Sequence, residues 1–436
     1  MVRDKFPGRE TSVAGNASKY AAGHGNEGTV TKSSSVLPPF SEPQRSTAQR
    51  FVRHVFVDMA GLWLDHGWDA AGSHNIERLQ AADLAPVLVG YRRSMAVARQ
   101  LFFFSQAWRI TGNEKYAARA HALYADLTGR FWDHQHHGWF FSLKTGADAQ
   151  APADPRKDAY GHAFAIFALA EYGAIFGKSA ALDWSQRTLV AMKQHLLLPQ
   201  GWYAQSASRD WRERDMALEQ NPHMHLLEAL LALHAATRDS AISQEGVLRD
   251  AGDIVLLFMQ RLRADDGTRV LEHFDAAGRP DGENGRIVEP GHSYEWAGLL
   301  LDYAAASGET QYRQIAMPLL AWADMHGVDP QHGGIYDQLD TESRVVSDRK
   351  RIWPMTECVK LQAMRAIAMA EPAAYAALDR RIAFLAQHYL TPGGGWREFL
   401  RRDLSPDSDY LPATTPYHIA TAALKVAEAY GIKVTS

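Results

Sequence analysis

The chain has 436 residues, of which 46% are hydrophobic and 22% charged, as expected for a globular protein with a large buried core. Its net charge of −4, with acidic and basic residues interleaved, offers no basic surface for nucleic acid. No apolar run approaches the roughly 20 residues that a membrane-spanning helix needs. We therefore expect neither a nucleic-acid nor a membrane partner. The single cysteine, Cys358, excludes an internal disulfide and fits a reducing, cytoplasmic compartment.

Residues 1–45 differ in composition from the rest of the chain. They are rich in glycine and serine, include Pro38-Pro39, and carry few large apolar side chains. Such a segment buries too little apolar surface to fold by itself, so we expect a disordered or loosely docked arm. Residues 46–436 are predicted to form a single catalytic domain.

Two kinds of helical segment alternate through this domain. The more apolar segments, which we expect to be buried on most faces, are residues 92–111, 159–176, 223–238, 292–306, 355–371 and 417–430. The more charged segments are residues 47–65, 114–130, 181–197, 243–263, 310–326 and 373–389. The pattern predicts an all-α fold, an (α/α)6 barrel in which six apolar helices lie inside six amphipathic ones. An open solenoid is the alternative, but it would need polar caps at both ends.

Glycine turns recur about 61 to 66 residues apart, and each precedes a polar residue by 24 or 25 positions. The turns are Gly138-Trp139, Gly201-Trp202, Gly267-Thr268, Gly333-Gly334 and Gly394-Gly395. The polar residues are His162, His225, His292, Glu357 and His418. Repeats of fixed period stack as equivalent units, so we expect these side chains to face one central pocket, walled by the loops that follow the turns.

Prolines place several of these residues near the starts of the inner helices, since proline is favoured in a first helical turn. The positive end of the helix dipole should stabilise an anion there. It should also lower the pKa of a histidine and keep the imidazole neutral, ready to accept a proton.

A histidine followed three residues later by a glutamate occurs twice, as His225…Glu228 and His292…Glu295. This spacing puts both groups on one helix face, so we expect each carboxylate to orient its imidazole or bind sugar hydroxyls.

Arg99 lies within an apolar helical segment and needs a buried partner. It either forms an ion pair, for example with Glu357, or stabilises developing negative charge. Trp296, Trp353 and Trp396 could stack on a sugar or pack in the core. Arg209, Arg212 and Arg349 could bind an anionic group if they point inward.

A metal site is the main rival interpretation, because histidines and carboxylates on facing helices can bind metals. The sequence has no His-Glu-x-x-His motif, cysteine pair or acidic cluster. We therefore expect no metal and no cofactor.

At these residues the chain resembles the N-acylglucosamine 2-epimerase superfamily over residues 90–420. The matching segments are Arg99-Gln-Leu-Phe-Phe-Phe-Ser105, Tyr160-Gly-His-Ala-Phe164, Asn221-Pro-His-Met-His-Leu-Leu-Glu228, Glu289-Pro-Gly-His-Ser-Tyr-Glu-Trp296, Trp353-Pro-Met-Thr-Glu357 and Pro416-Tyr-His418. The resemblance implies an (α/α)6 barrel that acts without metal on a reducing-end sugar, and it suggests a homodimer. Trp296 directly after Glu295 is more typical of the mannose isomerase branch.

The resemblance assigns catalytic roles to His292, His418, His225, Glu295 and Arg99. Candidate substrate-binding residues are His162, Glu228, Trp296, Trp353 and Glu357. We expect His418 to remove the carbon-2 proton to give a cis-enediolate, which Arg99 stabilises, while His292, oriented by Glu295, exchanges protons with the oxygens or carbon 1. Aldose–ketose isomerisation of the mannose-to-fructose type is the main prediction, and 2-epimerisation of an N-acylhexosamine or related sugar is the alternative. A glycoside hydrolase, which would need two suitably spaced carboxylates, and a non-catalytic sugar-binding protein are more distant alternatives.

Overall fold

The computed structural model describes residues 38–433 except residue 239, and the chain divides into residues 1–38 and a compact unit of residues 39–436. Most of the predicted N-terminal arm therefore lies outside the described residues. The first helix begins at Glu42, a few residues before the predicted domain start.

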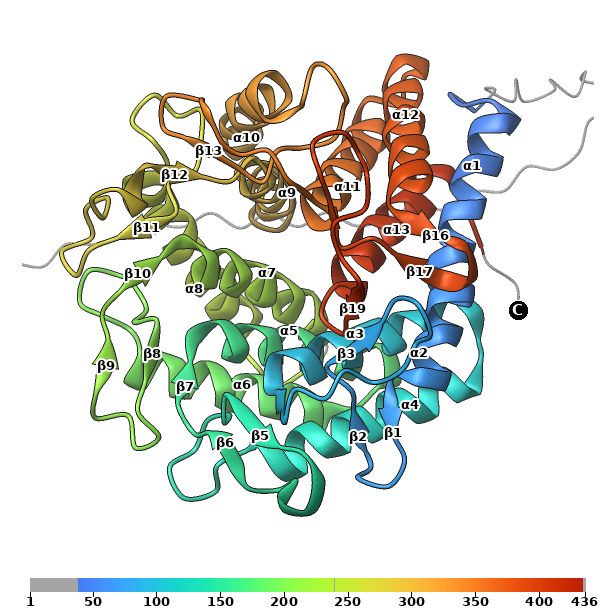
Figure 1. Ribbon diagram of the computed structural model, residues 1–436. Helices are drawn as coiled ribbons and strands as arrows, with labels where there is room; N and C mark the ends of the chain where they lie inside the picture. The colour runs from blue at the N-terminus through green and yellow to red at the C-terminus, as the bar shows by residue number, and fades with distance from the viewer. Residues whose placement is uncertain (1–37, 239, 434–436) are drawn as a thin grey trace, which may run out of the picture. The chain divides into compact units, whose positions relative to one another are not determined.

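Six inner helices form a closed ring within the compact unit (Figure 1). They are α3 (Ser94–Thr111), α5 (Ala159–Phe176), α7 (Gln220–Ala236), α9 (Pro290–Ser307), α11 (Ile352–Met369) and α13 (Pro416–Tyr430). Each packs on the next, and α13 packs back on α3. This contact closes the ring and excludes the open solenoid.

Six outer helical rods cover the ring, and most of them include a short π-helical turn. They are α1 (Glu42–Arg53) continued by η1 (His54–Met59) and α2 (Ala60–His66), α4 (Glu114–Asp126) with η2 (Leu127–Phe131), α6 (Ser179–His195), α8 (Gln244–Leu257) with η4 (Phe258–Leu262), α10 (Gln311–Trp322) with η6 (Ala323–Gly327), and α12 (Pro372–His388). The predicted (α/α)6 barrel is confirmed. Helix α5 is apolar and long enough to cross a membrane, but 72% of that window is buried, as expected for an inner helix of a barrel.

Short antiparallel strands link neighbouring repeats where the inner helices begin. The linking pairs are β4 (Tyr91–Arg93) with β5 (Ser142–Lys144), β7 (Lys157–Asp158) with β8 (Ser206–Ala207), β10 (Leu218–Glu219) with β11 (His273–Phe274), β12 (Ile287–Val288) with β13 (Gln338–Asp340), β15 (Lys350–Arg351) with β18 (Phe399–Leu400), and β19 (Tyr410–Pro412) with β3 (Arg78–Gln80). Three sheets are extended by β6 (Pro152–Asp154), β9 (Arg214–Asp215) and β14 (Val345–Ser347), while β1 (Trp68–Asp69) with β2 (His74–Asn75), and β16 (Leu390–Thr391) with β17 (Gly395–Trp396), form separate hairpins. The pair of β19 with β3 closes this rim as α13 and α3 close the ring.

The predicted glycine turns are tight reversals at the ends of outer helices. Gly138 has a φ of 72°, and a Cβ there would lie 2.4 Å from the Trp211 ring. Gly394 has a φ of 88°, and its Cβ would lie 2.4 Å from the backbone at Asp58. Both positions need glycine for conformation and for space.

Candidate active site

The residues that face the barrel axis are set by position along each inner helix rather than by distance from the glycine turn. The sixth residues of the six inner helices are Arg99, Phe164, His225, Glu295, Glu357 and Thr421. His292 and His418 are third residues, and His162 is a fourth residue. The predicted equivalence of the five counted residues is therefore wrong. All four histidines lie near the starts of inner helices, but only His225, His292 and His418 lie close to one another.

His418 has a carboxylate behind it that fixes its tautomer. Its Nδ1 lies 3.0 Å from Glu357 Oε1, and the other oxygen of Glu357 contacts the Lys360 ammonium. Burial raises the pKa of Glu357, but Lys360 and His418 outweigh it and hold that pKa at about 2. An ionised carboxylate can only accept a hydrogen bond, so His418 Nδ1 carries the proton and Nε2 is free to act as a base. Burial lowers the pKa of His418 to about 4, so the imidazole is neutral at pH 7.

His292 is in the opposite charge state. Its Nδ1 lies 2.9 Å from Glu272 Oε2 and 3.9 Å from Glu289 Oε2. Burial lowers the pKa of His292, but these two carboxylates and Glu295 outweigh it and raise the pKa to about 9. The imidazole is therefore a cation at pH 7, contrary to the expectation that a helix N-terminus keeps it neutral. Glu272, and not the predicted Glu295, orients it.

Trp353 lies between these two imidazoles. Its ring centroid is 4.8 Å from that of His292 and 5.7 Å from that of His418. The tryptophan is partly exposed, while both histidines are 7% exposed. A flat apolar face beside a base and an acid is a suitable platform for a sugar ring.

Arg99 is held by aromatic groups rather than by a carboxylate. Its guanidinium donates a hydrogen bond to the Tyr160 hydroxyl at 2.5 Å and lies 4.0 Å from the centroid of the Phe164 ring. Among the described residues no carboxylate pairs with it, so the predicted ion pair with Glu357 does not form. The cation remains available for a developing negative charge.

His225 and Glu295 are the remaining predicted catalytic residues, and they lie beside each other. His225 Nδ1 lies 3.1 Å from Glu228 Oε2, as predicted from their spacing, and 3.8 Å from Glu295 Oε1. The His225 and His418 ring centroids are 6.4 Å apart. Burial lowers the pKa of His225 to about 4 and, with the carboxylate of Glu357, raises that of Glu295 well above its usual range. The oxygens of Glu295 have no hydrogen-bond partner among the described residues.

Two predicted substrate-binding residues have structural roles instead. His162 accepts a hydrogen bond from the Trp139 backbone N–H at 3.0 Å and donates one to the Asp158 carbonyl at 2.7 Å, so both ring nitrogens are used. Trp296 is fully buried, stacks on Phe258, and donates to Gln220. Neither can reach a substrate in this geometry.

The two predicted carboxylates lie behind the imidazoles. Glu357 has no exposed surface, and Glu228 accepts a hydrogen bond from the Tyr417 hydroxyl as well as contacting His225. Both are positioned to orient histidines rather than to touch a sugar. The buried Trp396 donates to Glu398 and belongs to the core.

Two groups of three residues have the spacing to hold a metal ion. They are His225, Glu228 and Glu295, and Glu295, Glu357 and His418, each with ligand atoms within 4.8 Å of one another. In the second group the Lys360 ammonium contacts Glu357 and supplies a positive charge itself.

Sequence reasoning missed Glu272, Lys360 and two tyrosines. Glu272 directly precedes β11 and lies 20 residues before His292, so no local pattern connects them. Tyr160 and Tyr417 were accessible to prediction, because each is, like Trp353, the second residue of its inner helix.

Fold and site together define a barrel enzyme suited to proton transfer on a small polar molecule. The model of the N-acylglucosamine 2-epimerase family matches residues 45–422, and the chain therefore belongs to that family.

Relatives of the chain carry the names of both isomerases and epimerases. The chain is 31% identical over 374 residues to a mannose-6-phosphate isomerase of Rhizobium meliloti (strain 1021), covering 83% of this chain and 92% of that protein. It is 26% identical over 266 residues to a cellobiose 2-epimerase of Bacteroides fragilis, covering 58% and 65%. A crystal structure of D-mannose isomerase has the same fold, with a TM-score of 0.78 and 22% identity over 88% of this chain and 98% of that one. The protein is an enzyme that isomerises or epimerises carbohydrates.

Proposed function

We propose that the protein interconverts a free aldose and its ketose, with D-mannose and D-fructose as the type substrates. One observation carries this proposal. His418 and His292 flank Trp353 and are held in opposite charge states, with pKa values of about 4 and about 9. Paired groups whose environments separate their pKa values in this way identify a base and an acid.

The two imidazoles can carry out all the proton transfers of the isomerisation without a proton from solvent. Neutral His418 removes the proton from carbon 2 as the C–H electrons form the C1–C2 double bond, and His292 protonates the oxygen on carbon 1. His292 then takes the proton from the oxygen on carbon 2, and His418 delivers its proton to carbon 1. Arg99 stabilises the negative charge that develops on the oxygens of carbons 1 and 2 while these proton transfers take place. We assign His225 to opening the sugar ring.

This proton balance favours isomerisation over epimerisation. In the isomerase cycle each imidazole returns to its starting charge state. A two-base epimerisation, in which His292 protonates the opposite face of carbon 2, would leave both histidines in the unfavourable state until solvent reset them. The pKa difference of the pair therefore opposes the epimerase alternative.

We further propose that the substrate carries no phosphate, although one relative is named for a phosphosugar. The arginines that could have bound an anion are already paired. Arg209 contacts Asp133 at 2.8 Å, Arg349 contacts Asp407 at 2.7 Å, and Arg212 contacts Asp210 at 3.4 Å. In each pair the carboxylate offsets the charge of the guanidinium and so weakens its attraction for a phosphate.

The test is to incubate the enzyme separately with D-mannose, D-glucose, D-mannose 6-phosphate, N-acetylmannosamine and cellobiose, and to identify products by NMR. We expect D-fructose from D-mannose and a much smaller kcat/KM for the phosphate. Conversion of D-mannose to D-glucose without fructose, or of N-acetylmannosamine to N-acetylglucosamine, would establish the epimerase instead. Release of monosaccharide from cellobiose would indicate a hydrolase.

We also propose that the enzyme acts without a metal, as a homodimer, in the cytoplasm. The buried thiol of Cys358 is compatible with a reducing compartment. Sedimentation analysis measures the oligomeric state, and cell fractionation measures the location.

A further inference from the structure

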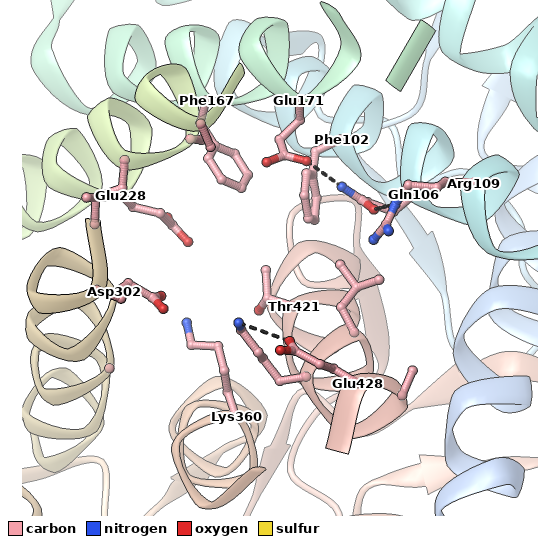
Figure 2. A pocket seen from close by; sticks show the side chains of 18 of the residues that line it. Phe102, Gln106, Arg109, Phe167, Glu171, Glu228, Asp302, Lys360, Thr421 and Glu428 are labelled. Atoms are coloured by element: carbon pink, nitrogen blue, oxygen red, sulfur yellow. Dashed lines mark hydrogen bonds and ion pairs between the residues drawn. The ribbon is translucent and has the colours of Figure 1, made fainter. Parts of the chain in front are cut away.

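A large cavity opens into the barrel from the end opposite the rim strands. It has a volume of about 990 Å³ and is lined by residues from the second halves of the inner helices (Figure 2). Its lining includes all six ninth residues of the inner helices, which are Phe102, Phe167, Glu228, Gly298, Lys360 and Leu424. These ninth residues lie three positions beyond the sixth residues, an axial step of about 4.5 Å at 1.5 Å per residue, and we call this space the rear cavity.

Lys360 connects the rear cavity with the active site. It is 9% exposed, and its side chain points into the cavity in Figure 2. Its ammonium contacts Glu357, the carboxylate whose other oxygen lies 3.0 Å from His418 Nδ1. Lys360 and Glu357 thus connect this solvent-accessible cavity to His418, the proposed catalytic base.

We propose that Lys360 is a positioning residue for His418: its ammonium keeps Glu357 ionised, and Glu357 in turn holds His418 with Nε2 unprotonated. The rear cavity is the route by which solvent and small cations reach this ammonium. The inference rests on the proposed function, since it assigns to Lys360 a part in the work of its base.

The ionisable groups around Lys360 leave its ammonium without a ready substitute beside Glu357. Helix α7 presents Glu228, α9 presents Glu295 and Asp302, α11 presents Glu357, and α13 presents His418 and Lys425. Arg99 of α3 and His225 of α7 lie close enough to His418 to lower its pKa. Lys425 contacts Glu428 at 3.2 Å rather than Glu357.

Loss of the ammonium would therefore raise the pKa of Glu357. Burial opposes the ionisation of Glu357, and the contact with His418 would then have to favour it without the ammonium. A protonated Glu357 donates a hydrogen bond to His418 Nδ1 rather than accepting one. The imidazole proton then moves to Nε2, and the base is lost.

The test compares Lys360→Met and Lys360→Gln with Lys425→Met, which removes a lysine of the same cavity that does not contact Glu357. We expect the acid limb of the kcat/KM profile for D-mannose to move upward by at least one pH unit in both Lys360 variants. At pH 4, near the pKa of His418, kcat/KM should therefore fall at least fivefold. Lys360→Arg should recover most of the activity, and Lys425→Met should keep the wild-type profile. Glutamine fills similar space, so a folded uncharged variant is available if methionine disrupts the barrel.

Chemical rescue tests the cavity as a route. Lys360→Ala should regain activity, at least fivefold, on addition of ethylammonium or propylammonium chloride, while sodium chloride at equal ionic strength should have no effect. A folded Lys360→Gln enzyme with an unshifted pH profile would overturn the assignment, as would loss of activity that neither shifts with pH nor responds to the amines. If wild-type enzyme converts none of the sugars, the proposed function fails. If only the Lys360 results fail, the proposed function stands.

Discussion

Two pairs of buried histidines near the starts of inner helices differ in the partners of their ring nitrogens. His162 and His223 face the glycine turns, where each accepts a hydrogen bond from a backbone N–H and donates one to a backbone carbonyl. His292 and His418 face the barrel axis, where each has a carboxylate behind Nδ1 and no hydrogen bond at Nε2 among the described residues. Burial alone therefore does not distinguish a structural histidine from a catalytic one. The two kinds differ in the group that contacts Nδ1, a backbone carbonyl or a carboxylate, and in whether Nε2 already has a hydrogen-bond partner.

Alanine variants of His292 and His418 on the one hand and of His223 on the other should give the largest contrast. His418→Ala and His292→Ala should each lower kcat by about 10²- to 10⁴-fold, the usual contribution of a general acid or base. His223→Ala should lower the melting temperature, because it leaves the Tyr203 N–H unpaired. Its kcat for D-mannose should stay near the wild-type value. Near-normal turnover in His418→Ala or His292→Ala would contradict the distinction between catalytic and structural histidines.

Glu272→Gln tests whether the carboxylate sets the charge of His292. The enzyme is active while His292 is a cation, that is, below its pKa of about 9, and loses activity above it. Removing Glu272, the carboxylate closest to His292 Nδ1, should move the alkaline limb of kcat/KM downward by about 1 to 3 pH units. The control is Glu219→Gln, at the rim strand β10, where the profile should not move. An unchanged alkaline limb would assign the charge to Glu289 instead.

Trp353 at the site and Trp296 in the core should show the same contrast, with a smaller effect on catalysis. Trp353→Ala should raise KM by up to about tenfold, because aromatic stacking contributes about 0.5–1.5 kcal/mol. Trp296→Ala should cost about 3–5 kcal/mol of stability through the cavity it leaves, with little change in KM for the folded fraction. Denaturant unfolding and steady-state kinetics on both variants would separate the two effects, and equal changes in KM would contradict the placement of Trp296.

The smallest expected effect is that of metal removal. Dialysis against EDTA should leave kcat and KM for D-mannose unchanged, since Lys360 and Arg99 provide the positive charges that the proposed steps need. A loss of activity that zinc, manganese or cobalt restores would show that one of the two His and Glu groups holds an ion.

The fold could be predicted to a large extent from the sequence because it depends on local signals. Apolar periodicity predicted residues 159–176 as a helix, and α5 has the same bounds. Glycines with positive φ marked the turns, and six repeats suggested ring closure.

The site could be predicted only in part. His225 and Glu228 lie one helical turn apart, so their contact followed from spacing. Counting from the glycine turns failed for His162 because the rim loops differ in length, which moves the counted residue along its helix. The partner of His292 could not be found by counting at all, since Glu272 comes from a loop brought near by the pairing of β10 with β11. The charge of His292 depends on this contact and was mispredicted for the same reason, whereas the lowered pKa values expected for His225 and His418 are confirmed.

The most direct test of the account is the protonation state of the axial imidazoles. Histidine labelled with ¹⁵N, with resonances assigned through His292→Asn and His418→Asn variants, reports the charge and tautomer of each ring. At pH 7 we predict an imidazolium at position 292 and a neutral ring at 418 with its proton on Nδ1. A neutral ring at 292, or a proton on Nε2 of 418, would contradict the assignment of acid and base.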